Sequence, residues 1–144
     1  MGAPENKENK RLVRLFYEAG NRGDFDTCFN LIADDIRWTN IGSTRFSGTY
    51  HGKKELMEKL LGPLFSRLKS GINSTIERLF ADGDFVIALT SGSAETTDGR
   101  PYNNQYCQVM RIDGGKIAEV TEYFDTELTS SIFGDDRNAA QHTA

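Results

Sequence analysis

The chain has little histidine and little cysteine, which limits the metal and redox chemistry it can support. It has two histidines, His51 and His142, and the second lies in a polar tail. Its two cysteines, Cys28 and Cys107, are far apart and lack the spacing of metal ligands. We therefore expect free thiols, no bound metal, no cofactor and a cytoplasmic location.

The sequence also lacks a long apolar run, a secretion signal and an excess of positive charge. No segment approaches the length of a membrane span, and no charged start is followed by an apolar stretch. The net charge is −4, so we expect neither nucleic acid nor a membrane as a partner. The 144 residues suit one domain, and 38% hydrophobic residues are ordinary for a globular protein.

Helical patterns fill the first half of the chain and strand patterns the second. Apolar spacing predicts helices over residues 7–20, 25–33 and 52–69, the last interrupted at Pro63. Alternation predicts strands over residues 36–41, 72–80 and 85–96, and two more within 99–125. Helices grouped against an antiparallel sheet predict one α+β domain over residues 7–128. We expect a disordered start at 1–6 and a polar tail at 129–144.

The last two predicted strands flank Gly114-Gly115, which is a turn signal. With these glycines as the loop, Tyr106 faces Tyr123 and Asn104 faces Asp125 on one side of the sheet. That side is otherwise mostly apolar and aromatic. The pairing therefore predicts Asp125 at the bottom of an apolar pocket, where burial raises the pKa of a carboxyl group.

In the same pairing, the opposite face of this hairpin carries Cys107, Val120 and Glu122. We interpret that face as the outside of the sheet and as the contact surface of a homodimer. The pocket on the other face predicts a small hydrophobic molecule as the ligand.

Two sequence patterns, one near each end of the domain, carry a family resemblance. Gly23-Asp24-Phe25 is followed by FNLIADD at residues 29–35, and GKIAEVTEYFD ends at Asp125. In order and spacing, over roughly residues 12–128, the chain resembles the SnoaL-like and ketosteroid-isomerase-like branch of the NTF2-like proteins. The resemblance implies a cone, in which a strongly curved antiparallel sheet wraps over three N-terminal helices and encloses a pocket.

The steroid isomerases and the polyketide cyclases of this branch imply different chemistry for this chain. The isomerases have a tyrosine at the position of Phe16 and an aspartate base at that of Asn40. Phenylalanine cannot donate a hydrogen bond and an amide cannot take a proton, so the resemblance does not support that route. The SnoaL-like cyclases use one pocket aspartate, which matches Asp125. One general acid/base suffices when the substrate C–H is already acidic.

The limonene epoxide hydrolases offer a third comparison. Their water-holding asparagine falls on Asn40, a neighbouring tyrosine on Trp38 and a catalytic aspartate on Asp125. Their arginine and second aspartate fall on Leu89 and Ser91, which supply neither the charge nor the second carboxyl group. Epoxide opening is therefore the less favoured chemistry.

These comparisons predict an enzyme that transfers protons on a small hydrophobic carbonyl compound, as a cyclase, isomerase or dehydratase. The alternative is a small-molecule-binding module without catalysis. The expected catalytic residue is Asp125. The expected substrate-binding residues are Trp38, Asn40, Asn104, Tyr106, Tyr123 and Tyr17.

Overall fold

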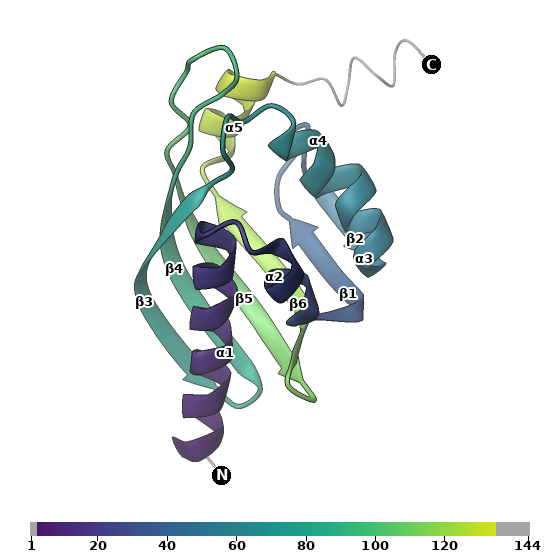
Figure 1. Ribbon diagram of the computed structural model, residues 1–144, viewed down its shortest axis with the longest axis vertical. Coiled ribbons are helices and arrows are strands. Elements are labelled where there is room, and N and C mark those ends of the chain that lie inside the picture. Colours follow the sequence, from purple (N-terminus) through teal and green to yellow (C-terminus); the bar gives the residue numbers. More distant parts are fainter. Residues whose placement is uncertain (1–2, 135–144) are drawn as a thin grey trace.

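The computed structural model describes residues 3–134 and has a six-stranded curved sheet with helices packed on it (Figure 1). The helical segments are α1 (Ala3–Asn21), α2 (Phe25–Asn30), α3 (Gly52–Glu55), the π-helix η1 (Leu56–Leu61), α4 (Gly62–Phe65) and α5 (Thr126–Phe133). The strands are β1 (Ile32–Asn40), β2 (Gly48–His51), β3 (Asn73–Asp82), β4 (Phe85–Ser93), β5 (Asn104–Asp113) and β6 (Lys116–Phe124). The expected α+β class is confirmed.

The strand order is β2-β1-β6-β5-β4-β3, and β1 and β6 form the parallel pair. Helices α1 and α2 lie across one face of the sheet, while the α3–α4 segment lies beside β1 and β2 (Figure 1). Alternating side chains of the strands meet these helices in one apolar core. This arrangement gives the sheet an inner, helix-covered face and an outer face.

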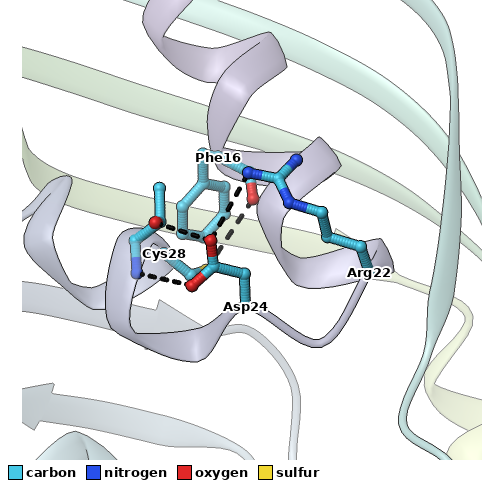
Figure 2. Close-up of polar contacts among 5 residues, drawn as sticks. Phe16, Arg22, Asp24 and Cys28 are labelled. Carbon is cyan, nitrogen blue, oxygen red and sulfur yellow. Dashed lines mark hydrogen bonds and ion pairs between the residues drawn. The ribbon is translucent and has the colours of Figure 1, made fainter.

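A side-chain cap begins α2 just after the end of α1 (Figure 2). The Asp24 carboxylate accepts hydrogen bonds from the Thr27 backbone N–H at 3.2 Å and from the Thr27 hydroxyl at 2.7 Å. These bonds, with a weaker contact to Arg22 at 3.5 Å, lower the pKa of Asp24. The Cys28 thiol donates to the Phe16 carbonyl at 3.7 Å, and burial raises its pKa to about 11. Cys28 therefore stays a protonated packing group.

The helix expected over residues 52–69 is instead three short segments with a π-turn in the middle. The Gly62 N–H bonds to the Met57 carbonyl, which is five residues back. Pro63 has no N–H to continue the α-helical pattern, and it lies in the first turn of α4. The wider π-turn places Met57, Leu60 and Leu61 on the cavity wall.

Helical segments extend past both expected ends of the domain within the described residues. Helix α1 begins at Ala3, inside the start that the sequence led us to expect as disordered. Helix α5 occupies part of the expected polar tail, and its Phe133 is buried edge-on against Phe46 and Tyr102, at 5.3 and 4.9 Å between ring centroids. The remaining tail, residues 135–144 with His142, lies outside the described residues.

A one-residue β-bulge at Ala118 decides which side chains of β6 face inward. Ile112 pairs with Ile117, but the next pair is Arg111 with Glu119, so Ala118 has no partner on β5. Because strand side chains alternate, one extra residue turns every later side chain to the opposite face. The pairing expected from an unbroken hairpin is therefore wrong beyond Ile117.

Candidate functional site

A cavity of about 810 Å³ lies between the inner face of the sheet and the helices that cover it. This volume is in the range of small-molecule sites. Its wall is mostly apolar and comes from α1, α2, the η1–α4 segment and the inner face of β1, β4, β5 and β6. The polar side chains relevant to chemistry are Tyr17, Asn40, Thr90, Tyr102, Tyr106, Gln108, Glu122 and Thr129.

Three polar residues form a row across the inner face of the sheet. Glu122 on β6 is the register partner of Gln108 on β5 and of Asn40 on β1. The Gln108 amide Nε2 donates to Glu122 Oε1 at 2.6 Å. The row places one carboxyl group between two amides within an apolar enclosure.

Glu122 is the ionisable group of the cavity whose pKa is shifted into the neutral range. Burial raises the pKa of Glu122 from 4.5 to about 7, and the hydrogen bond from Gln108 opposes part of that effect. Near neutral pH this carboxyl group therefore exists in both protonation states. A group with that property can take up and return a proton during one reaction cycle.

Trp38 and Asn40 form a fixed part of the cavity wall. The Trp38 indole Nε1 donates to Asn40 Oδ1 at 2.9 Å, and Asn40 Nδ2 donates to the Phe46 carbonyl at 3.1 Å. Both side chains are more than nine-tenths buried. These bonds hold the Asn40 amide in one orientation beside Glu122.

Two tyrosines face the cavity from opposite sides. Tyr17 comes from α1 and Tyr106 from β5, and burial is the main reason that the pKa of each hydroxyl is raised. The negative charge of Glu122 raises both pKa values further, and Tyr102 also acts on Tyr106. Each phenol therefore stays protonated and can act as a hydrogen-bond donor.

The structure contradicts the predicted position of Asp125. Its carboxylate accepts from the Leu128 N–H at 3.1 Å and caps α5, and its side chain is exposed outside the cavity. The Ala118 bulge is the cause, because it exchanges the two faces of β6. The catalytic assignment of Asp125 fails with its position.

Two further residues expected to bind substrate also lie elsewhere. Tyr123 pairs with Cys107 on the outer face and is 49% exposed. The Asn104 amide is fully used within the protein: it donates to Tyr102, Thr129 and the Asp125 carbonyl, and accepts from the Gln105 and Asp125 N–H groups. Asn104 thus ties β5 to the start of α5. By contrast, Trp38, Asn40, Tyr106 and Tyr17 line the cavity, and their binding role stays a prediction.

Sequence reasoning missed Glu122, which it placed on the outer face. A usable signal was present: Val120, Glu122 and Phe124 alternate, so an acid stands between two large apolar residues. Two adjacent buried residues, Ile117 and Ala118, precede them. Such a pair interrupts strict alternation and is typical of a bulge.

The inner face of β4 supplies no charge to the cavity. Leu89 and Ser91 face outward, where the Ser91 hydroxyl donates to Glu77 at 2.6 Å. The inward residues of this strand include Ala88 and Thr90. The arginine–aspartate pair of the limonene epoxide hydrolases therefore has no counterpart on either face at these positions.

Among residues 3–134, no cluster of three His, Cys, Asp or Glu side chains could hold a metal ion. Within the same range, no helix has both the length and the apolar character needed to cross a membrane.

Gly92 allows the close packing of the cavity wall near Tyr106. A Cβ atom at this position would lie 2.9 Å from both Tyr106 Cε1 and Ile72 Cγ2. We expect Gly92→Ala to lower the free energy of unfolding by about 1–3 kcal/mol and to narrow the cavity, because both side chains line it. Urea unfolding checks this result, and unchanged stability would contradict it. The matched control is Ser93→Ala, at an exposed position on the same strand as Gly92. Gly83→Ala is unsuitable because Gly83 has a positive φ, which strains an alanine at that position.

Comparison with known proteins agrees with this architecture. The SnoaL-like domain family matches residues 13–120. The epoxide hydrolase EphG of Mycobacterium tuberculosis is 31% identical over 120 residues, which cover 78% of this chain and 70% of that protein.

Solved structures show the same fold. The structure of an LEH-like epoxide hydrolase from M. tuberculosis is similar with a TM-score of 0.73 and 26% identity, covering 97% of this chain and 98% of that one. Bal32a, from a soil-derived mobile gene cassette, has a TM-score of 0.78 and 22% identity, covering 90% and 98%. The chain therefore belongs to the SnoaL-like domain family and has an NTF2-like fold.

Proposed function

We propose that this protein is an enzyme that moves protons on a small apolar carbonyl compound, with Glu122 as the general acid/base. The observation that supports the proposal is one carboxyl group with a pKa of about 7 inside an apolar cavity of about 810 Å³. Asp125, the residue first expected in this role, is replaced by Glu122 because only the latter faces the cavity.

In the proposed reaction, the Glu122 carboxylate takes a proton from the carbon next to the carbonyl group. The electron pair of that C–H bond moves toward the carbonyl oxygen and forms an enolate. Tyr17 lines the cavity, and the charge of Glu122 adds to burial in raising the pKa of its hydroxyl. This hydroxyl, which has no protein partner among the described residues, donates a hydrogen bond to the enolate oxygen. Glu122 then returns the proton to another carbon, or to the alkoxide formed when the enolate carbon attacks a second carbonyl group.

Exchange of the α-hydrogen of an α-alkylated β-keto ester for deuterium, followed by NMR, tests the proposal without knowledge of the natural substrate. We expect the wild-type protein to accelerate exchange above the buffer rate and above the rate with heat-denatured protein. Binding of the ester with no acceleration would instead favour the small-molecule-binding module.

The Tyr17 hydroxyl is expected to contribute to the exchange reaction as a donor to the developing negative charge. Tyr17→Phe keeps the ring but removes that donor, so we expect the exchange rate to fall by about 10- to 100-fold. The fold should survive, because this hydroxyl has no protein partner among the described residues. An unchanged rate with intact binding would exclude Tyr17 from the mechanism. Tyr123→Phe on the outer face is the matched control.

Epoxide hydrolysis is the second candidate, because a relative at 31% identity is named an epoxide hydrolase and Asn40 stands beside Glu122 in the row. Glu122 would take a proton from water while the water oxygen attacks an epoxide carbon. The C–O bond breaks, and the freed oxygen takes up the proton held by Glu122. Diol formation from styrene oxide, measured by chromatography, separates this reaction from α-hydrogen exchange.

We also propose that two copies of the chain pair through the outer face of the sheet. Apolar side chains gather there on neighbouring strands, and they include the partly exposed Phe80, Phe85 and Tyr123. Burying such a patch against a second copy removes it from water. Sedimentation equilibrium should give twice the mass of the chain, and Leu89→Glu should shift the mass toward that of the monomer.

A further inference from the structure

Gln108 carries a hydrogen-bonding atom that the protein leaves unused. Its amide Nε2 is bonded to Glu122, but its Oε1 atom is buried and has no partner among the described residues. The side chain is 7% exposed and lines the cavity. A buried acceptor without a partner destabilises the folded protein, so a ligand that supplies the partner recovers that free energy.

The neighbouring carboxylate determines which end of the amide is available. With Glu122 ionised, the donor end of Gln108 points to the carboxylate, because the opposite orientation would place two oxygen acceptors together. The free end is consequently the Oε1 atom, which only accepts hydrogen bonds. Such an atom can be satisfied by a hydroxyl or N–H group and not by an ether or a carbonyl oxygen.

Gln108 Oε1 is one of two fully buried side-chain polar atoms without a partner among the described residues. Among buried side-chain oxygen and nitrogen atoms of the described residues, only Tyr17 Oη shares this lack of a partner, and its phenol is a donor for a carbonyl oxygen. The Asn40 amide is already bonded to Trp38 and Phe46. Among these fully buried atoms, Gln108 Oε1 is therefore the acceptor without a partner and Tyr17 Oη the donor without one.

We propose that Gln108 is a specificity-determining residue that selects ligands with a hydroxyl group near the reacting carbon. The substrate class is then an apolar hydroxy-carbonyl compound, whose hydroxyl donates to Gln108 Oε1. The carbonyl half of this assignment rests on the proposed function, whereas the hydroxyl half rests on Gln108 alone. Sites built to pair a substrate hydroxyl reject analogues that lack it, because their own polar group is then left unpaired.

The test compares alcohols with their methyl ethers, which keep the oxygen but lose the donor. The probes are the meta and para isomers of hydroxymethylacetophenone and the corresponding methoxymethyl compounds, titrated by calorimetry at about pH 8, above the pKa of Glu122. Trp38 is the single tryptophan and lines the cavity, so its indole N–H signal in NMR shows that each probe binds there. We expect at least one alcohol to bind wild-type protein about 10-fold or more tightly than its ether.

Two variants assign the preference to Gln108. In Gln108→Leu the alcohol-to-ether ratio should fall below about 2, whereas Tyr123→Phe on the outer face should keep the wild-type ratio because it leaves the cavity unchanged. Equal binding of alcohol and ether by wild-type protein would overturn the proposal even if Gln108→Leu did not fold. A preference that survives in Gln108→Leu would also overturn it.

The two proposals fail in different ways. Absence of α-hydrogen exchange by the wild-type protein would defeat the proposed acid/base function but would leave the binding ratio unaffected. Normal exchange with equal binding of the two probes would retain Glu122 and remove Gln108 as the specificity determinant.

Discussion

Glu122→Gln is expected to reduce the rate of α-hydrogen exchange by about 10²- to 10⁴-fold, the usual contribution of a positioned general base. Glutamine has nearly the size of glutamate, and its Oε1 atom can still accept the hydrogen bond from Gln108. It cannot take up a proton. The loss should therefore appear in the exchange rate while the affinity for a ketone probe, measured by calorimetry, changes little.

Asp125→Asn is the matched control for this variant, because it makes the same chemical change on a neighbouring residue. Asp125 is exposed and caps α5, and asparagine is also a good cap, so both rate and stability should be retained. Loss of exchange in Asp125→Asn together with normal exchange in Glu122→Gln would reverse the assignment.

The pH dependence of exchange gives an independent check on Glu122 as the base. With its pKa at about 7, the active carboxylate form is lost as the pH falls. The rate constant for exchange at low probe concentration, corrected for the buffer reaction, should fall about tenfold per pH unit below 7 and level off above it. A midpoint near 4.5, the ordinary value for glutamate, would show that the group in use is not desolvated.

The architecture could be predicted from the sequence because it rests on patterns that repeat. Helical spacing marked α1 and α2, and alternation with turn glycines marked the long strands. Boundaries were less accurate: β1 begins at Ile32 and not at Ile36, and the helix over 52–69 is broken by the π-turn before Pro63. These details depend on tertiary packing, which a local pattern does not contain.

The predicted position of Asp125 was wrong for a specific geometric reason. The turn at Gly114-Gly115 and the pair Ile112–Ile117 were both placed correctly. A single unpaired residue, Ala118, then reversed the faces of β6, so that Glu122 moved inward and Asp125 outward. Register errors of this kind exchange a whole set of residues at once. Trp38 and Asn40 were unaffected because the irregularity in β1 falls between Ile32 and Arg37, before both of them.

Glu122→Gln is also expected to stabilise the protein at neutral and higher pH. The folded-state pKa of about 7 lies above the ordinary value of 4.5, so the folded protein binds more protons than the unfolded chain between these values. Stability due to this group is present at low pH and is lost as the pH rises through 7. The full difference corresponds to about 3 kcal/mol, which glutamine avoids because it is never charged. We therefore expect unfolding at about pH 8 to require about 3 kcal/mol more in Glu122→Gln than in wild type.

The sign and the pH dependence distinguish this effect from ordinary changes in packing. At about pH 5 the wild-type carboxyl is mostly protonated when folded, so the advantage of glutamine should shrink to under about 1 kcal/mol. Urea unfolding at both pH values measures the two differences, and Asp125→Asn should show no comparable gain at the higher pH. A variant that is no more stable than wild type at pH 8 would mean that water solvates Glu122 in the folded protein. The acid/base proposal would then lose its physical basis, because the same desolvation that weakens the fold is what brings the pKa to the range useful for proton transfer.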